Sequence, residues 1–272
     1  MKKYDLKPIN RSKLRLLAGK AYYSLSRYLL WYSGKIKFAE NQSKQNLKYV
    51  IFSHKTPLLR KLRDVDMQYQ YNKITNLKLA VGKIDSIIIK PGETFSYWKL
   101  IGKTTARKGY VPGMVLHYGN YTKGIGGGLC QLSNLIYWMT LHTPLTIVER
   151  YRHSFDVFPD SNRTQPFGSG ATCVYPYRDL MIRNDTNEDY KLKVKVGQSY
   201  LEGSWYSNSK PIYKYEIIEK NHHFESEFWG GFSRHNELYR RCYTSEDVLL
   251  YEEYITENHA LMMYSPFLDS SN

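Results

Sequence analysis

The chain has 272 residues, enough for one large domain or two modest ones. Hydrophobic residues make up 42% of it and charged residues 24%, and these ordinary values exclude a chain that is disordered throughout. The net charge of +14 favours acidic partners, but because no zinc-finger spacing or RNP-like motif accompanies the basic residues, we do not expect nucleic acid to be one of them.

The first predicted element is a basic amphipathic helix between Ser12 and Ser33. Leucine, alanine and tyrosine recur there at helical spacing, with arginine and lysine between them. Because charged residues interrupt the apolar ones, the segment has the pattern of neither a secretory signal nor a membrane span, and we expect a cytoplasmic protein. The helix either docks on its own domain or holds the protein peripherally on the anionic inner face of the membrane.

Further elements follow in chain order. Residues 47–52 predict a strand, residues 72–84 a helix, and residues 86–89 a β-branched strand closed by a Pro-Gly turn. The glycine-rich stretch from Gly102 to Gly128 predicts loops and close backbone approach rather than regular elements.

Residues 129–143 carry the clearest helical pattern of the chain. Their apolar side chains form one stripe, and Pro144 ends the run. Beyond Pro144 the hydrophobic period changes to two, which indicates strands. We therefore predict an α+β fold in which this central helix, with its GGGxCQ motif, packs on a mainly antiparallel sheet built largely from residues 145–206. The predicted division is a basic helical segment (1–45), a main domain (46–206) and a β-rich C-terminal extension (207–272).

The three cysteines, Cys130, Cys173 and Cys242, are too few and too scattered for a disulfide framework. Their odd number leaves at least one thiol free, which fits a reducing compartment. No CxxC pair is present, so a structural zinc site made from cysteines is not expected.

Cys130 is the candidate nucleophile. It follows three glycines and begins the central helix on the side opposite the apolar stripe. A helix N-terminus stabilises negative charge, so the pKa of this thiol should be lowered there, and bare glycines would let a substrate reach backbone N–H groups. The residues expected to bind substrate are Gly126, Gly127, Gly128, Gln131 and Asn134.

His153, on a predicted strand, is the candidate general base. A cysteine on a helix followed by a histidine on a strand is the order found in papain-like and transglutaminase-like thiol enzymes. The group that would orient the imidazole is assigned to Asp179, with Asp156 and Asn184 as alternatives. Asp156 falls on the opposite strand face from His153. The competing interpretation is that Cys130 is a buried, inert thiol.

A histidine-rich tail offers a separate alternative. His222, His223, His235 and His259 lie near the C-terminus, and a metal site there would need carboxylates such as Glu225 and Glu227. Our prediction from the sequence is that the protein uses no metal and no cofactor.

The sequence around Cys130, GGGLCQLSN at residues 126–134, resembles the glycine-rich cysteine motif of the VanW family. The resemblance is dense over residues 70–190 and continues into the tail. The other segments that carry it are residues 76–77, 91–96, 109–110, 142–147, His153, 179–180, 183–185, 229–231, 234–237 and 255–261.

The resemblance implies an association with glycopeptide resistance or the bacterial cell envelope. One hypothesis is a thiol hydrolase or acyl transferase that acts on peptidoglycan-type amides or esters. The alternative is a non-catalytic accessory protein that binds a cell-wall precursor, a peptide-like ligand or partner proteins. Many family members have Asp where this chain has Gly170, which removes one acid that could orient His153. Many also look secreted or membrane-anchored, whereas this chain shows no export signal.

Overall fold

The computed structural model describes residues 11–60, 66–117, 119–158 and 164–265. Residues 1–10 of the predicted N-terminal segment and 266–272 of the predicted extension lie outside this range. The helices within it are α1 (Lys13–Tyr32), α2 (Met67–Ile84), the short α3 (Tyr97–Ile101), a 3-10 turn (Ala106–Lys108) and α4 (Cys130–Leu141).

The strands form two four-stranded sheets, a three-stranded sheet and a hairpin within the described residues. Every pairing between these strands is antiparallel except that of β13 with β7. The predicted α+β class with mainly antiparallel sheets is therefore confirmed. In sheet order, the strands are β1 (Tyr49–Pro57), β10 (Tyr200–Ser207), β9 (Tyr190–Val196) and β2 (Ile88–Ile89); β11 (Tyr213–Ser226), β12 (Phe232–Thr244), β13 (Leu249–Met262) and β7 (Phe155–Asp156); β3 (Thr94–Ser96), β8 (Met181–Arg183) and β6 (Thr146–Glu149); and β4 (Pro112–His117) with β5 (Asn120–Ile125).

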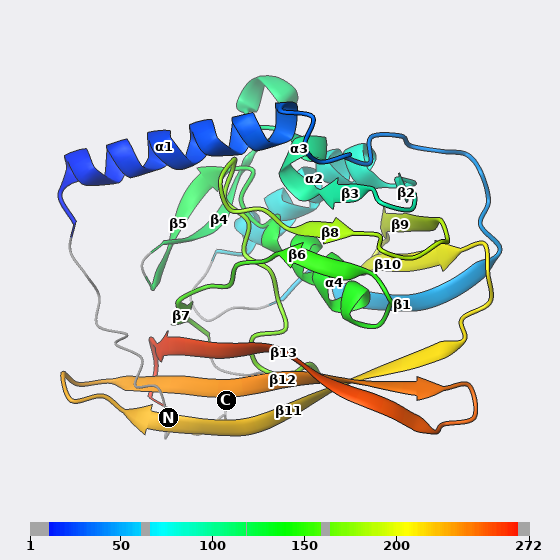
Figure 1. The fold of residues 1–272 in the computed structure, drawn as a ribbon. Coiled ribbons are helices and arrows are strands. Elements are labelled where there is room, and N and C mark those ends of the chain that lie inside the picture. The colour runs from blue at the N-terminus through cyan, green and yellow to red at the C-terminus, as the bar shows by residue number, and fades with distance from the viewer. Residues whose placement is uncertain (1–10, 61–65, 118, 159–163, 266–272) are drawn as a thin grey trace.

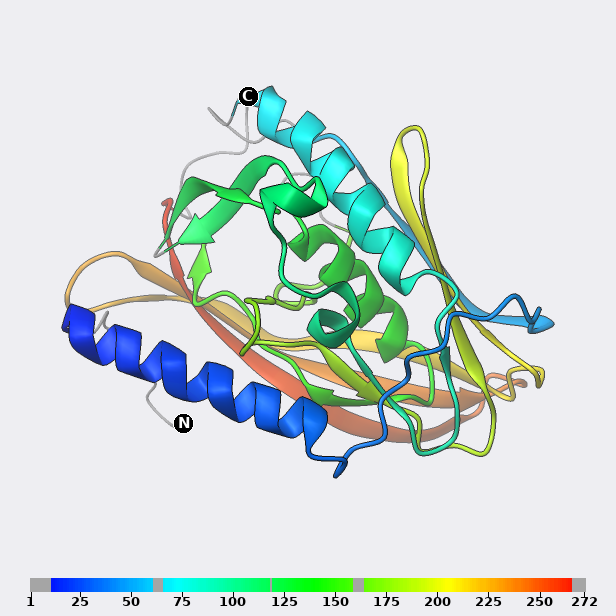
Figure 2. The ribbon, with the colours of Figure 1, turned by 90° about the horizontal axis from the view of Figure 1, so that it is seen from above.

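Helix α4 lies in the centre of the molecule, between α1 and α2 when seen from above (Figure 2). Its apolar stripe contacts β1 and β10. Gly203 of β10 makes this contact close, because a Cβ there would come within 2.6 Å of the Met139 Cε atom. Trp205 of β10 is fully buried and donates a hydrogen bond to Thr140 (3.2 Å). The contact buries large apolar side chains on both elements, and it holds the start of α4 in one place.

Helix α1 docks through its C-terminal half only. Trp31 is buried and its indole N–H donates to Ser96 (3.1 Å), while Arg27 is buried among polar partners. Leu14 and Leu17, in the N-terminal half, are 80% and 65% exposed. The structure thus shows a docked helix whose first turns present apolar side chains to solvent. No described helix combines the length and the apolar character needed to cross a membrane.

The stretch predicted as loops between Gly102 and Gly128 contains a regular hairpin, β4 and β5. Hairpin strands were missed because glycine and exposed polar residues interrupt the alternation of apolar residues on which strand prediction depends. The strand predicted around His153 is also shorter than expected, since only β7 forms there. His153 itself lies in the irregular segment before it.

Strands β11, β12 and β13 form a long antiparallel sheet. Figure 1 shows this sheet on the opposite side of the molecule from α1. Its outer strand, β11, has mostly exposed or half-buried side chains, whereas residues 233–236 in the middle strand β12 are all buried.

Candidate functional site

The glycine-rich turn before α4 is fastened to helix α2 by one side chain. Asn76 of α2 donates hydrogen bonds to the carbonyl oxygens of Val111 (3.0 Å) and Gly127 (2.9 Å), and its own oxygen accepts from the Val111 N–H (2.9 Å). Because Asn76 is fully buried, these bonds are shielded from water. They fix both the start of the β4–β5 hairpin and the entry to α4.

The three glycines lie against the protein's own atoms. A Cβ on Gly127 would come within 2.3 Å of the backbone carbonyl carbon of Gly113, and one on Gly126 would come within 2.6 Å of Thr104. Gly128 has a φ of +90°, and a Cβ there would meet the aliphatic stem of Lys73 at 2.4 Å. Close packing and backbone conformation thus account for all three. Their predicted contact with a substrate stays a prediction.

The polar residues next to the glycines also have internal partners. Gln131 donates to the Thr56 hydroxyl (2.8 Å) and the Pro57 carbonyl (2.8 Å) at the end of β1. The Asn134 side chain accepts from the Ala171 N–H (2.8 Å). Substrate binding by these two residues likewise stays a prediction, and their observed role is to hold β1 and the 170–171 segment against α4.

Cys130 is the first residue of α4, half-buried, and is not disulfide-bonded. Burial raises the pKa of its thiol, although hydrogen bonds from the backbone N–H groups of Cys173 and of Cys130 itself lower it. Burial outweighs the helix terminus, so the lowered pKa that the sequence predicted is wrong. Cys173 lies beside it, and burial raises the pKa of that thiol well above the ordinary value.

His153 is half-buried between cationic neighbours. Burial, followed by the charges of Arg152 and Arg178, lowers the pKa of His153 to about 4. The imidazole is therefore neutral at pH 7 and is a weak base. Within the described part of the chain, no side chain makes a hydrogen bond to His153 that would orient its ring.

Asp179 is fully buried in a polar cluster of its own. One carboxylate oxygen accepts the Ser96 hydroxyl, and the other accepts the backbone N–H groups of Trp98 (2.9 Å) and Leu180 (2.9 Å). Burial raises the pKa of Asp179 to about 7, although these hydrogen bonds and the Arg27 charge lower it. Its hydrogen bonds tie the start of α3 to the entry of β8.

Arg27 connects this cluster to α1. Its guanidinium pairs with Glu149 and donates to the Tyr177 carbonyl (3.2 Å), and Glu149 accepts the Asp179 N–H (3.1 Å). A buried ion pair of this kind is destabilising to break, because either partner alone would be a buried, uncompensated charge.

The two alternative orienting residues also have other partners. Asp156 is buried and accepts hydrogen bonds from Tyr264 (2.8 Å) and Arg234 (3.4 Å). Asn184 is buried and donates to the carbonyls of Ile89 (2.8 Å) and Glu188 (2.7 Å). Their hydrogen bonds, like those of Asp179, hold the fold together.

Lys73 is a residue that the sequence analysis missed. It is buried on α2 beside Gly128, and its ammonium donates to Gln70 (2.7 Å). Burial, with a smaller contribution from the charge of Arg60, lowers the pKa of Lys73 to about 8. A lysine with a lowered pKa beside a candidate site can act as a base. Lys73 lies three or four residues from Gln70, Asn76 and Leu77, so helical periodicity places it on the same buried face of α2. This spacing is the signal that could have identified it.

A surface groove lies beside α1, close to the Arg27 cluster. It has a volume of about 320 Å³ and combines tyrosine rings with cationic side chains. Its lining residues are Tyr23, Ser26, Arg27, Leu29, Leu30, Ser33, Lys35, Tyr151 and Tyr177. Tyrosine rings offer flat apolar faces with polar tips, and cations attract carboxylate or phosphate, so the groove fits a polar, anionic ligand.

Comparison with known proteins identifies relatives of the chain. The family model described as VanW like protein matches residues 72–206. The vancomycin B-type resistance protein VanW of Enterococcus faecalis is 35% identical over 193 residues, which cover 71% of this chain and 70% of that protein. An uncharacterized protein, YoaR of Bacillus subtilis, is 31% identical over 120 residues, or 44% of this chain and 38% of that protein. No solved structure matches the chain.

Proposed function

Because the chain belongs to the VanW family, we propose that it takes part in vancomycin resistance as a non-catalytic accessory protein that binds a cell-wall precursor or a similar peptide-like ligand. The E. faecalis relative is named as a resistance protein. That name supports the biological setting of the proposal, and the contacts of the candidate residues support the non-catalytic role.

The observation that carries the non-catalytic role is the bonding of Asp179. Its two carboxylate oxygens already accept three hydrogen bonds, from Ser96, Trp98 and Leu180. A catalytic triad needs an acid that accepts the imidazole N–H and stabilises the imidazolium. Asp179 makes these hydrogen bonds instead of one to His153. The His153 imidazole has a pKa of about 4, so its imidazolium lacks the stabilisation that a general base needs.

The groove beside α1 is the proposed binding place. Tyr151 and Tyr177 would contact the apolar faces of a sugar or peptide, while Lys35 would attract a carboxylate or phosphate. Its volume of about 320 Å³ is at the lower end of small-molecule pockets, so one or two residues of a precursor would fit at a time.

The thiol hydrolase or acyl transferase hypothesis is the second candidate. It is favoured by one observation, the two backbone N–H groups, from Cys130 and Cys173, that lower the pKa of the Cys130 thiol against the effect of burial. Such groups could also stabilise an oxyanion. In this mechanism Lys73, with a pKa of about 8, would be a better base than His153.

A membrane role for α1 belongs to the same proposal. Leu14, Leu17 and Leu25 are exposed, and basic residues stand on the same helix. The exposed turns could rest on an anionic membrane surface, where lipid-linked wall precursors are found. The protein would then meet its ligand while bound peripherally to the inner face.

Calorimetric titration with a soluble nucleotide-linked muramyl peptide tests the proposal. We expect the intact chain to bind this peptide saturably, and Tyr151→Ala to weaken the affinity about tenfold or more. Tyr213 is an exposed tyrosine on β11 outside the groove, so Tyr213→Ala should leave the affinity unchanged.

Cys130→Ala separates the two candidates. A binding protein keeps its affinity in this variant, and mass spectrometry detects no altered peptide after incubation with either protein. Turnover by the wild type that Cys130→Ala abolishes would reject the non-catalytic role and select the thiol enzyme.

A further inference from the structure

Three histidines form a row across the C-terminal sheet. His223 of β11 pairs with His235 of β12, and His235 pairs with His259 of β13. Directly opposed residues of antiparallel strands project from the same face, so the three rings lie side by side. Glu225, two residues after His223, shares that face. Its carboxylate lies 3.9 Å from the His235 Nε2 atom.

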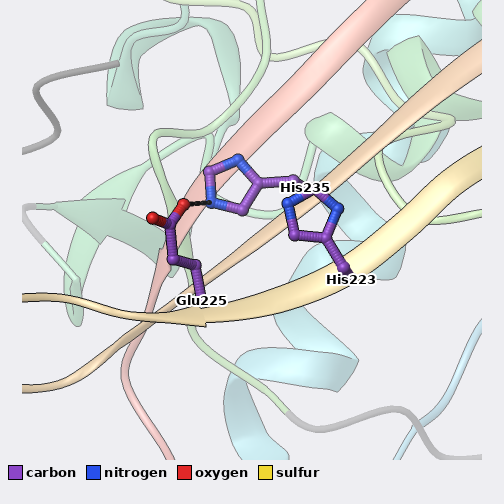
Figure 3. A group of neighbouring side chains, drawn as sticks. All are labelled: His223, Glu225 and His235. Carbon is purple, nitrogen blue, oxygen red and sulfur yellow. Dashed lines mark ion pairs between the residues drawn. The ribbon is translucent and has the colours of Figure 1, made fainter. Parts of the chain in front are cut away.

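Donor atoms of His223, Glu225 and His235 all lie within 4.8 Å of one another. Figure 3 shows the His235 ring between the Glu225 carboxylate and the His223 ring. His235 is 7% exposed, whereas half of the Glu225 side chain is accessible to solvent. One donor is thus held rigidly by the sheet, and the others can adjust around it.

The hydrogen bonds of His223 leave its Nε2 atom available. The Nδ1 atom lies 2.8 Å from the Asn221 carbonyl oxygen. A carbonyl can only accept, so Nδ1 carries the proton and the lone pair lies on Nε2. Asn221 stands at a β-bulge with a φ of +53°, which directs its carbonyl toward the ring.

The same reasoning applies to His235. Its Nδ1 atom lies 2.6 Å from Nδ1 of His259, so one of these nitrogens donates to the other. Glu257 lies 3.7 Å from Nε2 of His259 and favours a proton there. His259 Nδ1 is then the acceptor and His235 Nδ1–H the donor, which leaves the lone pair of His235 on Nε2, facing Glu225.

We propose that His223, His235 and Glu225 bind one divalent transition-metal ion of the zinc class. Two neutral imidazoles and a carboxylate are ligands that suit zinc and its neighbours rather than magnesium or calcium. Each imidazole also has its second nitrogen bonded to an acceptor, as metal-ligating histidines usually do. Three protein donors leave a fourth position for water or a ligand atom.

The donor atoms must move only slightly closer together to bind a zinc ion. Donor atoms of a tetrahedral zinc site are about 3.3 Å apart, given bonds of about 2.0–2.1 Å. The Glu225–His235 separation of 3.9 Å is close to this value. His223 must turn out of its stack on His235, where the ring centroids are 4.9 Å apart, and the Ser233 hydroxyl must release His235 Nε2. Shifts on the order of 1 Å in the exposed side chains of His223 and Glu225, with rotation of the buried Ser233 hydroxyl, suffice.

The charges around the three proposed ligands affect how well they bind a cation. Arg152 is the nearby cation that acts on both His235 and His259 and opposes binding. The Glu225 and Glu257 carboxylates oppose its effect. The site lies outside residues 72–206, which the family model matches, and it shares no residue with the groove beside α1.

Zinc chloride titrated into the full chain, produced without a polyhistidine tag, tests the proposal. We expect saturable binding of one zinc per chain by calorimetry and a zinc-dependent rise in melting temperature. Magnesium chloride at the same concentration should give neither. His223→Gln and Glu225→Gln should each weaken zinc binding about tenfold or more.

The chain offers matched controls. His222→Gln changes the histidine next to His223. Its Nε2 atom accepts a hydrogen bond from Arg234, and the alternation of side chains along β11 places it on the opposite face of the sheet. Glu227→Gln changes the next carboxylate after Glu225. Both should bind zinc like the wild type. Circular dichroism establishes that every variant is folded. Absence of one-to-one binding by the wild type, or equal losses in the control and ligand variants, overturns the proposal.

Discussion

Replacing Asp179 with Asn tests whether this buried acid supports the fold or serves His153. Burial raises the pKa of Asp179 from 3.8 to about 7 in the folded protein. In the unfolded chain the carboxyl returns to its ordinary value. The folded state therefore binds the proton more tightly, and ionisation of Asp179 destabilises the fold as the pH rises from about 4 to 7.

The size of the effect follows from the two pKa values. Their difference of about three units corresponds to about 4 kcal/mol in total. Between pH 5 and pH 8, linkage makes the wild type lose about 2–3 kcal/mol of stability through this group alone. Asn cannot ionise, so Asp179→Asn lacks that loss. The variant is destabilised by the altered bond to Ser96 at both pH values, but by about 2–3 kcal/mol less at pH 8.

Urea unfolding of both proteins at pH 5 and pH 8 measures this double difference, in which other titrating groups cancel. An acid that stabilised a His153 imidazolium would have a lowered pKa, and the wild type would then gain stability relative to the variant as the pH rises. A difference of zero, or one of opposite sign, would refute the account of Asp179 as a buried structural acid.

The remaining predictions concern the glycine turn, the thiol and helix α1. In urea unfolding, Gly127→Ala should destabilise the protein by about 1–3 kcal/mol, because the added Cβ would overlap the Gly113 backbone. Gly82→Ala is the control: no atom lies within 4 Å of its Cβ, and alanine should stabilise helix α2 by about 0.5–1 kcal/mol. Iodoacetamide labelling of Cys130 should be slow at pH 7 and accelerate above pH 9, because burial raises the pKa of this thiol; a rate that levels off near pH 7 would contradict this. The double variant Leu14→Ser with Leu17→Ser should sediment less with anionic vesicles than the wild type, and equal sedimentation would remove the membrane role of α1.

Local pattern was sufficient for the main helices. The predicted helix between Ser12 and Ser33 is α1, the one at 72–84 lies within α2, and the one at 129–143 contains α4. Helical periodicity and capping residues act over a few positions, so they can be recognised without knowledge of the fold. The period-two pattern predicted beyond Pro144 indicates strands for the same reason, and in β9 valine and lysine alternate as a strand requires.

The candidate site could not be predicted in the same way. Cys130 was found because three glycines and a helix start coincide there, but its pKa depends on burial and on a backbone hydrogen bond from Cys173, which is distant in the sequence. Lys73 was missed because its lowered pKa comes from burial beside Gly128, which is 55 residues further along the chain.

The sequence alone determined the family, the α+β class and the cysteine motif, because each depends on residues close together in the chain. Tertiary structure decided which polar groups meet. Asp179 bonds to Ser96, 83 positions away, rather than to His153, and strand register aligns His223, His235 and His259 in one row. Such pairings depend on burial and on register across the whole fold, and a shift of one residue in β12 would turn His235 to the other face and separate it from Glu225.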